Sequence, residues 1–148
     1  MESLAKEDLI YLAGLFDADG SLGIYSRTRN KKELMPRFNI SNTNQDIIYW
    51  LKETFGGYIT TQKSKNHRHK TKYMWNLNAN DCRKLIPRIY LFLKIKKSRA
   101  KLLLEFLSLT KNKQSFHHTI EHWEKLKDIK ERMEKLNERG ISRKKSSR

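Results

Sequence analysis

The stretch that decides the fold is LIYLAGLFDADGSLGI, residues 9–24. It opens with eight consecutive apolar residues and then places Asp17 and Asp19 in front of Gly20. Apolar residues recur at the helical period and uncharged residues fill the other side, so a helix over residues 6–18 is expected to be buried all round. In a small domain one side of such a helix can pack on a sheet. The other side needs a second element.

Two small residues on this helix, Gly14 and Ala18, stand four positions apart and therefore share one face. They would allow a second helix to approach the backbone closely. The alternative is that both are incidental small residues in the core of a single chain. The local sequence leaves the two readings open.

The composition favours a nucleic-acid partner. The chain of 148 residues carries 32 Lys and Arg against 16 Asp and Glu, which gives a formal net charge of +16. An acidic partner such as DNA or RNA would neutralise this field. The single cysteine, Cys82, cannot form an internal disulfide, and the longest apolar run falls short of the ~18 residues that a membrane span needs. We expect one domain over residues 1–140 and no membrane partner.

Two β-hairpins are predicted after the first helix. The first pairs residues 21–29 with residues 34–41, and the second pairs residues 58–62 with residues 72–77. In each hairpin apolar residues alternate with basic or polar ones, which predicts a sheet with one buried and one open face. A helix over residues 45–55, stopped by two glycines, separates the hairpins.

Helices are predicted for most of the remaining chain. One begins at a capping Asp81, the next near Lys97, and a long one covers about residues 116–137. The basic segment 141–148 is predicted to be a disordered tail. The fold class is therefore α+β, in the order αββαββα, with an antiparallel sheet whose helices lie on one face.

The open face of this sheet has the composition of a DNA-reading surface. Arg and Lys suit guanine and phosphate, and Asn and Gln suit adenine. A charged outer face is often only solvated, but this one is nearly free of carboxylates apart from Glu33. The candidate DNA-binding residues are Tyr25, Arg27, Arg29, Arg37, Asn39, Thr60, Gln62, Lys72, Met74 and Asn76.

The nine residues LAGLFDADG, from Leu12 to Gly20, resemble the signature of the LAGLIDADG homing endonucleases and differ from it only at Phe16. The similarity extends over about residues 9–109 and includes FNISNTNQ and FLKIKKSRA. It implies the LAGLIDADG homing endonuclease fold, whose saddle-shaped antiparallel sheet straddles the DNA major groove. Chains with one motif are homodimers in this family, with their motif helices packed together. The residues that the resemblance places in the dimer interface are Leu12, Gly14, Leu15 and Ala18.

The resemblance also implies metal-dependent hydrolysis of DNA. Asp19 resembles the family's metal-binding acid, which would hold Mg²⁺ together with the backbone of Ala18, and hard oxygen ligands suit this ion. Asp17 is assigned a structural part near the helix end. Asn42 stands where the family often has a polar residue near the metal-bound water, commonly Gln. Lys96 matches the family's basic residue near the scissile phosphate, where a cation offsets developing charge.

The expected function is cutting of double-stranded DNA at a long, partly palindromic site by a homodimer. Two alternatives remain, an RNA-binding intron maturase and a non-catalytic DNA-binding protein of the same fold. Metal-dependent cutting separates the endonuclease from both. The wealth of Lys and Asn is compatible with an AT-rich coding sequence, and so with an intracellular protein of an organelle (chloroplast or mitochondrion) or of a prokaryotic cytoplasm.

Overall fold

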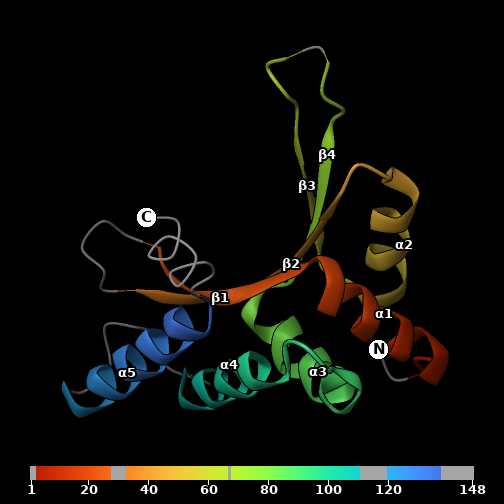
Figure 1. Cartoon of the computed structure of the whole chain (residues 1–148). Coiled ribbons are helices and arrows are strands. Elements are labelled where there is room, and N and C mark those ends of the chain that lie inside the picture. The colour runs from red at the N-terminus through yellow and green to blue at the C-terminus, as the bar shows by residue number, and fades with distance from the viewer. Residues whose placement is uncertain (1–2, 28–32, 67, 111–119, 138–148) are drawn as a thin grey trace, which may run out of the picture.

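The helices and strands follow one another in the predicted order (Figure 1). The computed structural model describes residues 3–27, 33–66, 68–110 and 120–137. Its elements are α1 (Lys6–Asp19), β1 (Gly20–Ser26), β2 (Leu34–Asn42), α2 (Gln45–Phe55), β3 (Tyr58–Gln62), β4 (Lys72–Asn76), α3 (Ala79–Ile89), the 3₁₀ turn η1 (Tyr90–Phe92), α4 (Lys97–Thr110) and α5 (Ile120–Asn137).

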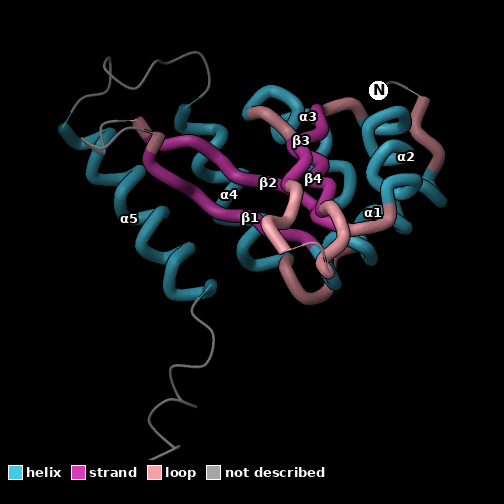
Figure 2. The backbone as a smooth tube through the Cα atoms, turned by 90° about the horizontal axis from the view of Figure 1, so that it is seen from above, coloured by secondary structure: helices cyan, strands magenta, loops and turns pink. Residues whose placement is uncertain are grey.

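The four strands form one antiparallel sheet in the order β1-β2-β4-β3. β2 and β4 are its two inner strands, and β2 pairs with β1 along Leu34–Ile40. β4 pairs with β2 only over Asn39–Asn42. The β1–β2 and β3–β4 hairpins therefore share a short centre and diverge from it, which leaves an open, concave face between them (Figures 1 and 2).

The helices cover the other face of the sheet, as predicted (Figure 1). Aromatic packing holds the layers together: the ring of Phe16 in α1 stacks on Phe38 in β2 with their centroids 4.0 Å apart. The indole N–H of the buried Trp75 in β4 donates to the carbonyl of Gly56 at 2.7 Å. Because the large buried side chains of β2 and β4, among them Phe38 and Trp75, point to this face, the alternating pattern of the sequence fixes which face is buried.

The C-terminal helix α5 packs against α4 and β1. Its buried side chains, Leu126, Ile129 and Met133, follow the helical period. At its end the amide of Asn137 donates to the carbonyl of Leu22 at 3.4 Å and fixes α5 to the sheet. The predicted helix start at 116 and the predicted tail 141–148 lie outside the described residues.

One predicted cap is wrong. The helix expected to begin at Asp81 begins earlier, and its N-cap is Asn78, whose side-chain oxygen accepts from the Asp81 N–H at 2.8 Å. Asp81 instead lies in the first turn, where its charge suits the helix dipole. None of the helices in the described ranges combines the length and the apolar content that a membrane crossing requires.

Candidate nucleic-acid interface and active site

The junction between α1 and β1 has no loop, because β1 starts at the residue after Asp19. Gly20 makes this possible: a Cβ at this position would lie 2.5 Å from the Cγ and Cε2 atoms of the Phe16 ring. A larger residue would push the strand away from the helix. The order Asp-Ala-Asp-Gly therefore delivers the end of α1 directly to the edge strand of the sheet.

Asp17 is buried at the end of α1 and is held by the segment that precedes α4. Its Oδ2 accepts from the backbone N–H of Lys94 at 2.7 Å, and its Oδ1 accepts from those of Ile95 and Lys96 at 3.1 and 2.9 Å. Three backbone N–H groups donate to this one carboxylate. Asp17 therefore links the end of α1 to a segment almost eighty positions later in the chain. The structural part expected for Asp17 is confirmed.

Asp19 is exposed, and within the described part of the chain its carboxylate has no hydrogen bond or ion pair. Next to it, the carbonyl of Ala18 belongs to the last helical turn and lacks an intrahelical donor. A carboxylate and a carbonyl are the hard oxygen donors that Mg²⁺ prefers, so these residues fit the implied ion. The described residues contain no group of three or more His, Cys, Asp and Glu side chains that could hold a metal, and one protomer offers only part of a metal site here.

Lys96 lies at the same helix end, but its side chain is turned inward. Only 2% of the residue is exposed, and its ammonium donates to the carbonyl of Asp17 at 2.7 Å. The ammonium also lies 5.9 Å from the ring centroid of Phe16. In this arrangement Lys96 caps the negative end of the α1 dipole. The exposed lysine of this segment is Lys94.

Asn42 is the last residue of β2 and closes the turn into α2. Its side-chain oxygen accepts from the backbone N–H of Asn44 at 2.8 Å, and the side-chain oxygen of Asn44 accepts from Ile47 at 3.2 Å as the N-cap of α2. The Asn42 carbonyl oxygen is thus used locally. Its amide N–H groups are what it can offer to a ligand.

The strand register brings the predicted reading residues together on the open face. Asn39 lies opposite Asn76, and Asn76 lies opposite Tyr58, so the three form one row across β2, β4 and β3. The next rows are Met74 with Thr60 and Lys72 with Gln62. The amides, hydroxyls and lysine expected from the alternation thus lie in adjacent rows of the sheet.

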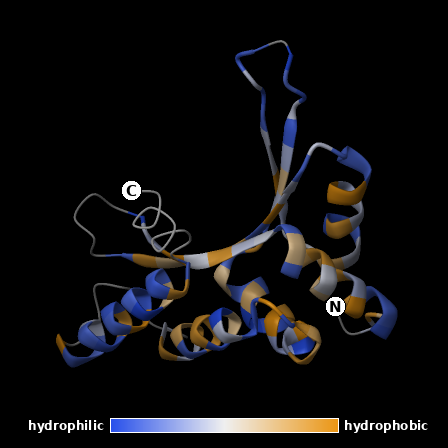
Figure 3. Ribbon diagram, in the orientation of Figure 1, coloured by the Kyte–Doolittle hydropathy of each residue, from blue (hydrophilic) through white to orange (hydrophobic). Residues whose placement is uncertain are grey.

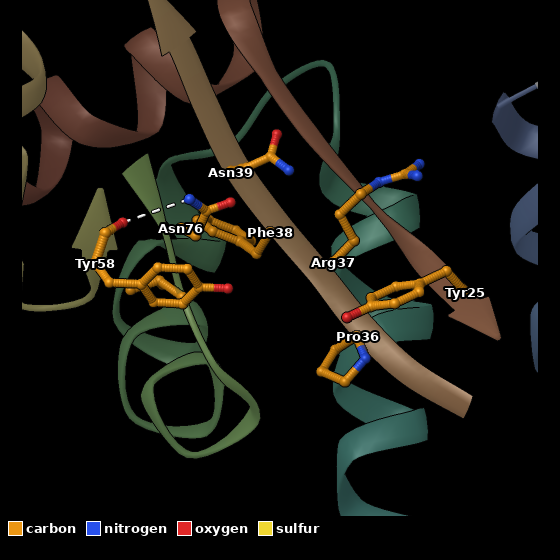
Figure 4. A pocket seen from close by; sticks show the side chains of 8 residues that line it. Tyr25, Pro36, Arg37, Phe38, Asn39, Tyr58 and Asn76 are labelled. Carbon is orange, nitrogen blue, oxygen red and sulfur yellow. Dashed lines mark hydrogen bonds between the residues drawn. The ribbon is translucent and has the colours of Figure 1, made fainter. Parts of the chain in front are cut away.

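A pocket of about 290 Å³ opens on this face and takes lining residues from all four strands (Figure 4). The amide of Asn76 donates to the carbonyl of Tyr58 at 3.4 Å beside it. Arg37 and Asn39 reach the pocket from β2. The residues that line it are Tyr25, Pro36, Arg37, Phe38, Asn39, Tyr58, Asn76 and Leu77.

Two further candidates, Arg27 and Arg29, follow β1 in the sequence. Arg27 is exposed and pairs with Glu33 across the hairpin at 3.5 Å, and Arg29 lies outside the described residues. Conversely, Tyr58 was missed by the sequence analysis. The signal was present, because Tyr58 alternates in phase with Thr60 and Gln62.

The surface of α1 requires a correction. Leu12 has no exposed surface and belongs to the hydrophobic core of the protomer. Gly14 and Ala18 do lie on the exposed side, together with the large apolar residues Ile10 and Tyr11, which are 46% and 53% exposed. The exposed face of α1 is therefore apolar and made partly of small residues.

Comparison with known proteins places the chain in a family. The model of the LAGLIDADG endonuclease family matches residues 12–103. The archaeal intron-encoded homing endonuclease I-Vdi141I, solved in complex with DNA, superposes with a TM-score of 0.73 at 24% identity, covering 91% of this chain and 87% of that one. The homing endonuclease I-CvuI in complex with a DNA target has a TM-score of 0.65 at 18% identity, with coverage of 88% and 82%.

Among curated proteins, the intron-encoded RNA maturase bI4 of Saccharomyces cerevisiae is 35% identical over 78 residues. These residues are 51% of this chain but 11% of the maturase, so the chain spans about a tenth of that protein. The structural likenesses concern the fold, and they confirm the predicted architecture. Because the family model covers α1, both hairpins and the start of α4, more than half of the chain, this protein belongs to the LAGLIDADG endonuclease family.

Proposed function

We propose that the chain is a site-specific endonuclease that hydrolyses both strands of double-stranded DNA with a divalent metal, acting as a homodimer. The observation that carries the proposal is the exposed carboxylate of Asp19 at the end of a rigidly held helix. Asp17 fixes that helix end through three backbone hydrogen bonds. The next residue opens the sheet that carries the reading residues, so a reactive carboxylate stands beside a DNA-binding surface.

A second copy of the chain supplies what one protomer lacks. One carboxylate is a weak site for a cation that takes several oxygen ligands, and the exposed apolar face of α1 needs a partner. Gly14 supports close packing, since a Cβ there would meet no atom within 4 Å in the protomer. Two further apolar residues in the segment that contacts α1, Leu91 and Ile95, are 70% and 68% exposed. Packing α1 against its copy would bury this surface and bring two Asp19 carboxylates together.

The chain's own residues then divide the work of hydrolysis. Asp19 and the carbonyl of Ala18 would hold Mg²⁺, which polarises a scissile phosphate and activates water when bound. The amide N–H groups of Asn42 can orient the attacking water. Lys96 keeps the helix end in place through its hydrogen bond to the Asp17 carbonyl, and in this arrangement its buried ammonium is not available to a phosphate.

The test is cleavage of a randomised pool of DNA duplexes with Mg²⁺, followed by sequencing of the ends. The wild-type chain is expected to produce recurrent staggered cuts within one partly palindromic sequence. Asp19→Asn is expected to lose the cuts and keep the binding, whereas Asp128→Asn, a matched change in an exposed residue of α5, keeps both. Binding without cuts by the wild type, with Mg²⁺ or Mn²⁺, would overturn the proposal.

A second candidate function is assistance to RNA splicing. It is favoured by the 35% identity to an intron-encoded RNA maturase. RNA binding makes no use of the Asp19 carboxylate, so a maturase would act equally well as Asp19→Asn. A splicing assay with an intron RNA, in which the variant matches the wild type while neither cuts DNA, would select this function over the endonuclease. Sequence-specific binding with neither cutting nor splicing would select the non-catalytic DNA-binding protein.

A further inference from the structure

The β3–β4 hairpin continues beyond the part of the sheet that can read bases. β2 ends at Asn42, which lies opposite Tyr73, and past this pair no strand among the described residues pairs with the hairpin. It stands away from the sheet as an arm whose outer part is hydrophilic (Figures 1 and 3). The outer part of this arm therefore lies beyond the open face of the sheet, which carries the proposed base-reading residues.

All the charged Lys, Arg, Asp and Glu side chains of the arm are positive. No Asp or Glu occurs between Glu53 and Asp81, a stretch that contains the whole hairpin. In the described part of the connection between β3 and β4, no cation is in an ion pair, and nearly all side chains are exposed. The basic residues of the arm beyond the row of Lys72 and Gln62 are Lys63, Lys65, Arg68 and Lys70.

The arm has a defined conformation that its own side chains hold. The hydroxyl of Ser64 accepts from the N–H of Asn66 at 3.2 Å, and the side-chain oxygen of Asn66 accepts from Arg68 at 3.1 Å. The N–H of His69 then donates to the carbonyl of Asn66 at 3.0 Å. These local turns use the short polar side chains for structure and leave the lysines free for a ligand.

A hollow of about 330 Å³ lies at the base of the arm, against the turn that follows β2. Its lining offers hydroxyl, amide, imidazole and ammonium groups and no carboxylate, a set suited to phosphate oxygens. The residues that line it are Thr43, Gln62, Ser64, His69, Lys70 and Lys72.

We propose that this arm binds the sugar-phosphate backbone of the DNA and supplies affinity that does not depend on sequence, with the hollow seating a phosphate. The inference rests on the proposed function for its DNA partner. Lysine is a flexible point charge suited to phosphate, whereas base recognition relies on bidentate Arg, Asn and Gln. In this proposal the side chains on the open face of the sheet contact the DNA bases, and the lysines of the arm contact the DNA phosphates.

The test compares two triple variants of equal charge. Lys63→Gln/Lys65→Gln/Lys70→Gln removes cations from the arm. The control, Lys84→Gln/Lys101→Gln/Lys127→Gln, removes three exposed lysines from α3, α4 and α5. Both lose three positive charges, so the long-range field changes by the same amount. Binding of the cleavage site and of a scrambled duplex is measured by fluorescence anisotropy over a range of KCl concentrations, after circular dichroism shows that the variants are folded.

The plot of log association constant against log salt has a negative slope, to which each phosphate contact contributes about 0.9 in magnitude. The arm variant is expected to make this slope less steep by about 2–3. The loss of affinity should be equal on the two duplexes, and the control should keep the wild-type slope. An unchanged slope, a loss confined to one duplex, or an equal loss in the control would overturn the inference. So would a loss seen only on structured RNA.

The experiments can overturn the proposed nuclease and the proposed role of the arm independently of each other. A wild-type protein that binds duplex DNA and never cuts would overturn the nuclease, and the salt slopes of the two triple variants on the scrambled duplex would still decide what the arm does. A wild type that cuts, with an arm variant of unchanged slope, would overturn the arm alone.

Discussion

Asp17 and Asp19 stand two positions apart at the end of α1 but lie in different surroundings. Asp17 is buried and accepts three backbone hydrogen bonds, so it is a structural residue. Asp19 is exposed and carries none within the described residues, so its oxygens are available to a ligand. The two side chains are chemically identical. Burial and hydrogen bonding make one of them structural and leave the other accessible to a ligand.

Replacing Asp17 by Asn should destabilise the protein. One oxygen becomes an NH₂ group, which cannot accept from the N–H of Lys94, and a buried donor loses its partner. We expect the free energy of unfolding in urea to fall by about 2–3 kcal/mol. Asp128→Asn, which affects an exposed ion pair with Arg132, should change it by less than about 1 kcal/mol. Equal effects of the two changes would contradict the role given to Asp17.

Cys82 should be inert in the folded protein. Burial, and then the nearby Asp81 carboxylate, raise the pKa of its thiol from 9.0 to about 12, against a lowering effect of Arg83. A thiol reagent at pH 8 should therefore modify Cys82 in urea and leave the native protein unmodified. Rapid modification without denaturant would contradict the buried position.

The same shift gives a dependence of stability on pH. Above about pH 9 the unfolded chain releases the thiol proton while the folded chain retains it, so the unfolded state binds fewer protons and stability falls as pH rises toward 12. Below pH 9 both states keep the proton and the thiol has no effect. Cys82→Ala should remove this contribution, and the difference between the urea unfolding curves of the two proteins at pH 8 and pH 10 measures it.

At the scale of elements, α1 has two apolar sides with different partners. Its inner side packs on β1 and β2, with Phe16 stacked on Phe38. Its outer side, with Ile10, Tyr11 and Gly14, is exposed in the protomer. The sequence alone predicted burial on all sides. The protomer covers only one of them, and this is the physical ground for expecting a second copy.

Gly14 allows assembly to be tested apart from folding. Gly14→Leu meets no atom of the protomer within 4 Å of the added Cβ, so the protein should fold, with a small gain in helix stability over glycine. The bulky side chain should keep two α1 helices apart. Sedimentation equilibrium is expected to show a monomer, whereas Leu136→Ala, on the exposed side of α5, should remain dimeric. A dimeric, fully active Gly14→Leu protein would rule out this packing.

At the scale of the whole molecule, the proposed function predicts that the length of the sheet sets the length of the DNA site. β2 has nine residues, which span about 30 Å at ~3.3 Å each. At ~3.4 Å per base pair this is roughly nine base pairs for each protomer. Footprinting on the cleaved sequence should therefore protect about eighteen base pairs or slightly more, in two related halves. Protection of only one half would contradict a dimer on DNA.

The sequence by itself determined the order of elements, the buried and open faces of the sheet and the position of Asp19. These follow from period, alternation and a short motif, which are local properties of the chain. Only the tertiary structure decided that Leu12 faces inward, that Lys96 is buried against α1 and that the β3–β4 arm leaves the sheet. Each depends on which segments distant in sequence meet, since the Asp17 carboxylate binds a loop that begins at Lys94 and the arm projects where β2 ends. Periodicity shows which side of an element is apolar, and packing decides what covers it.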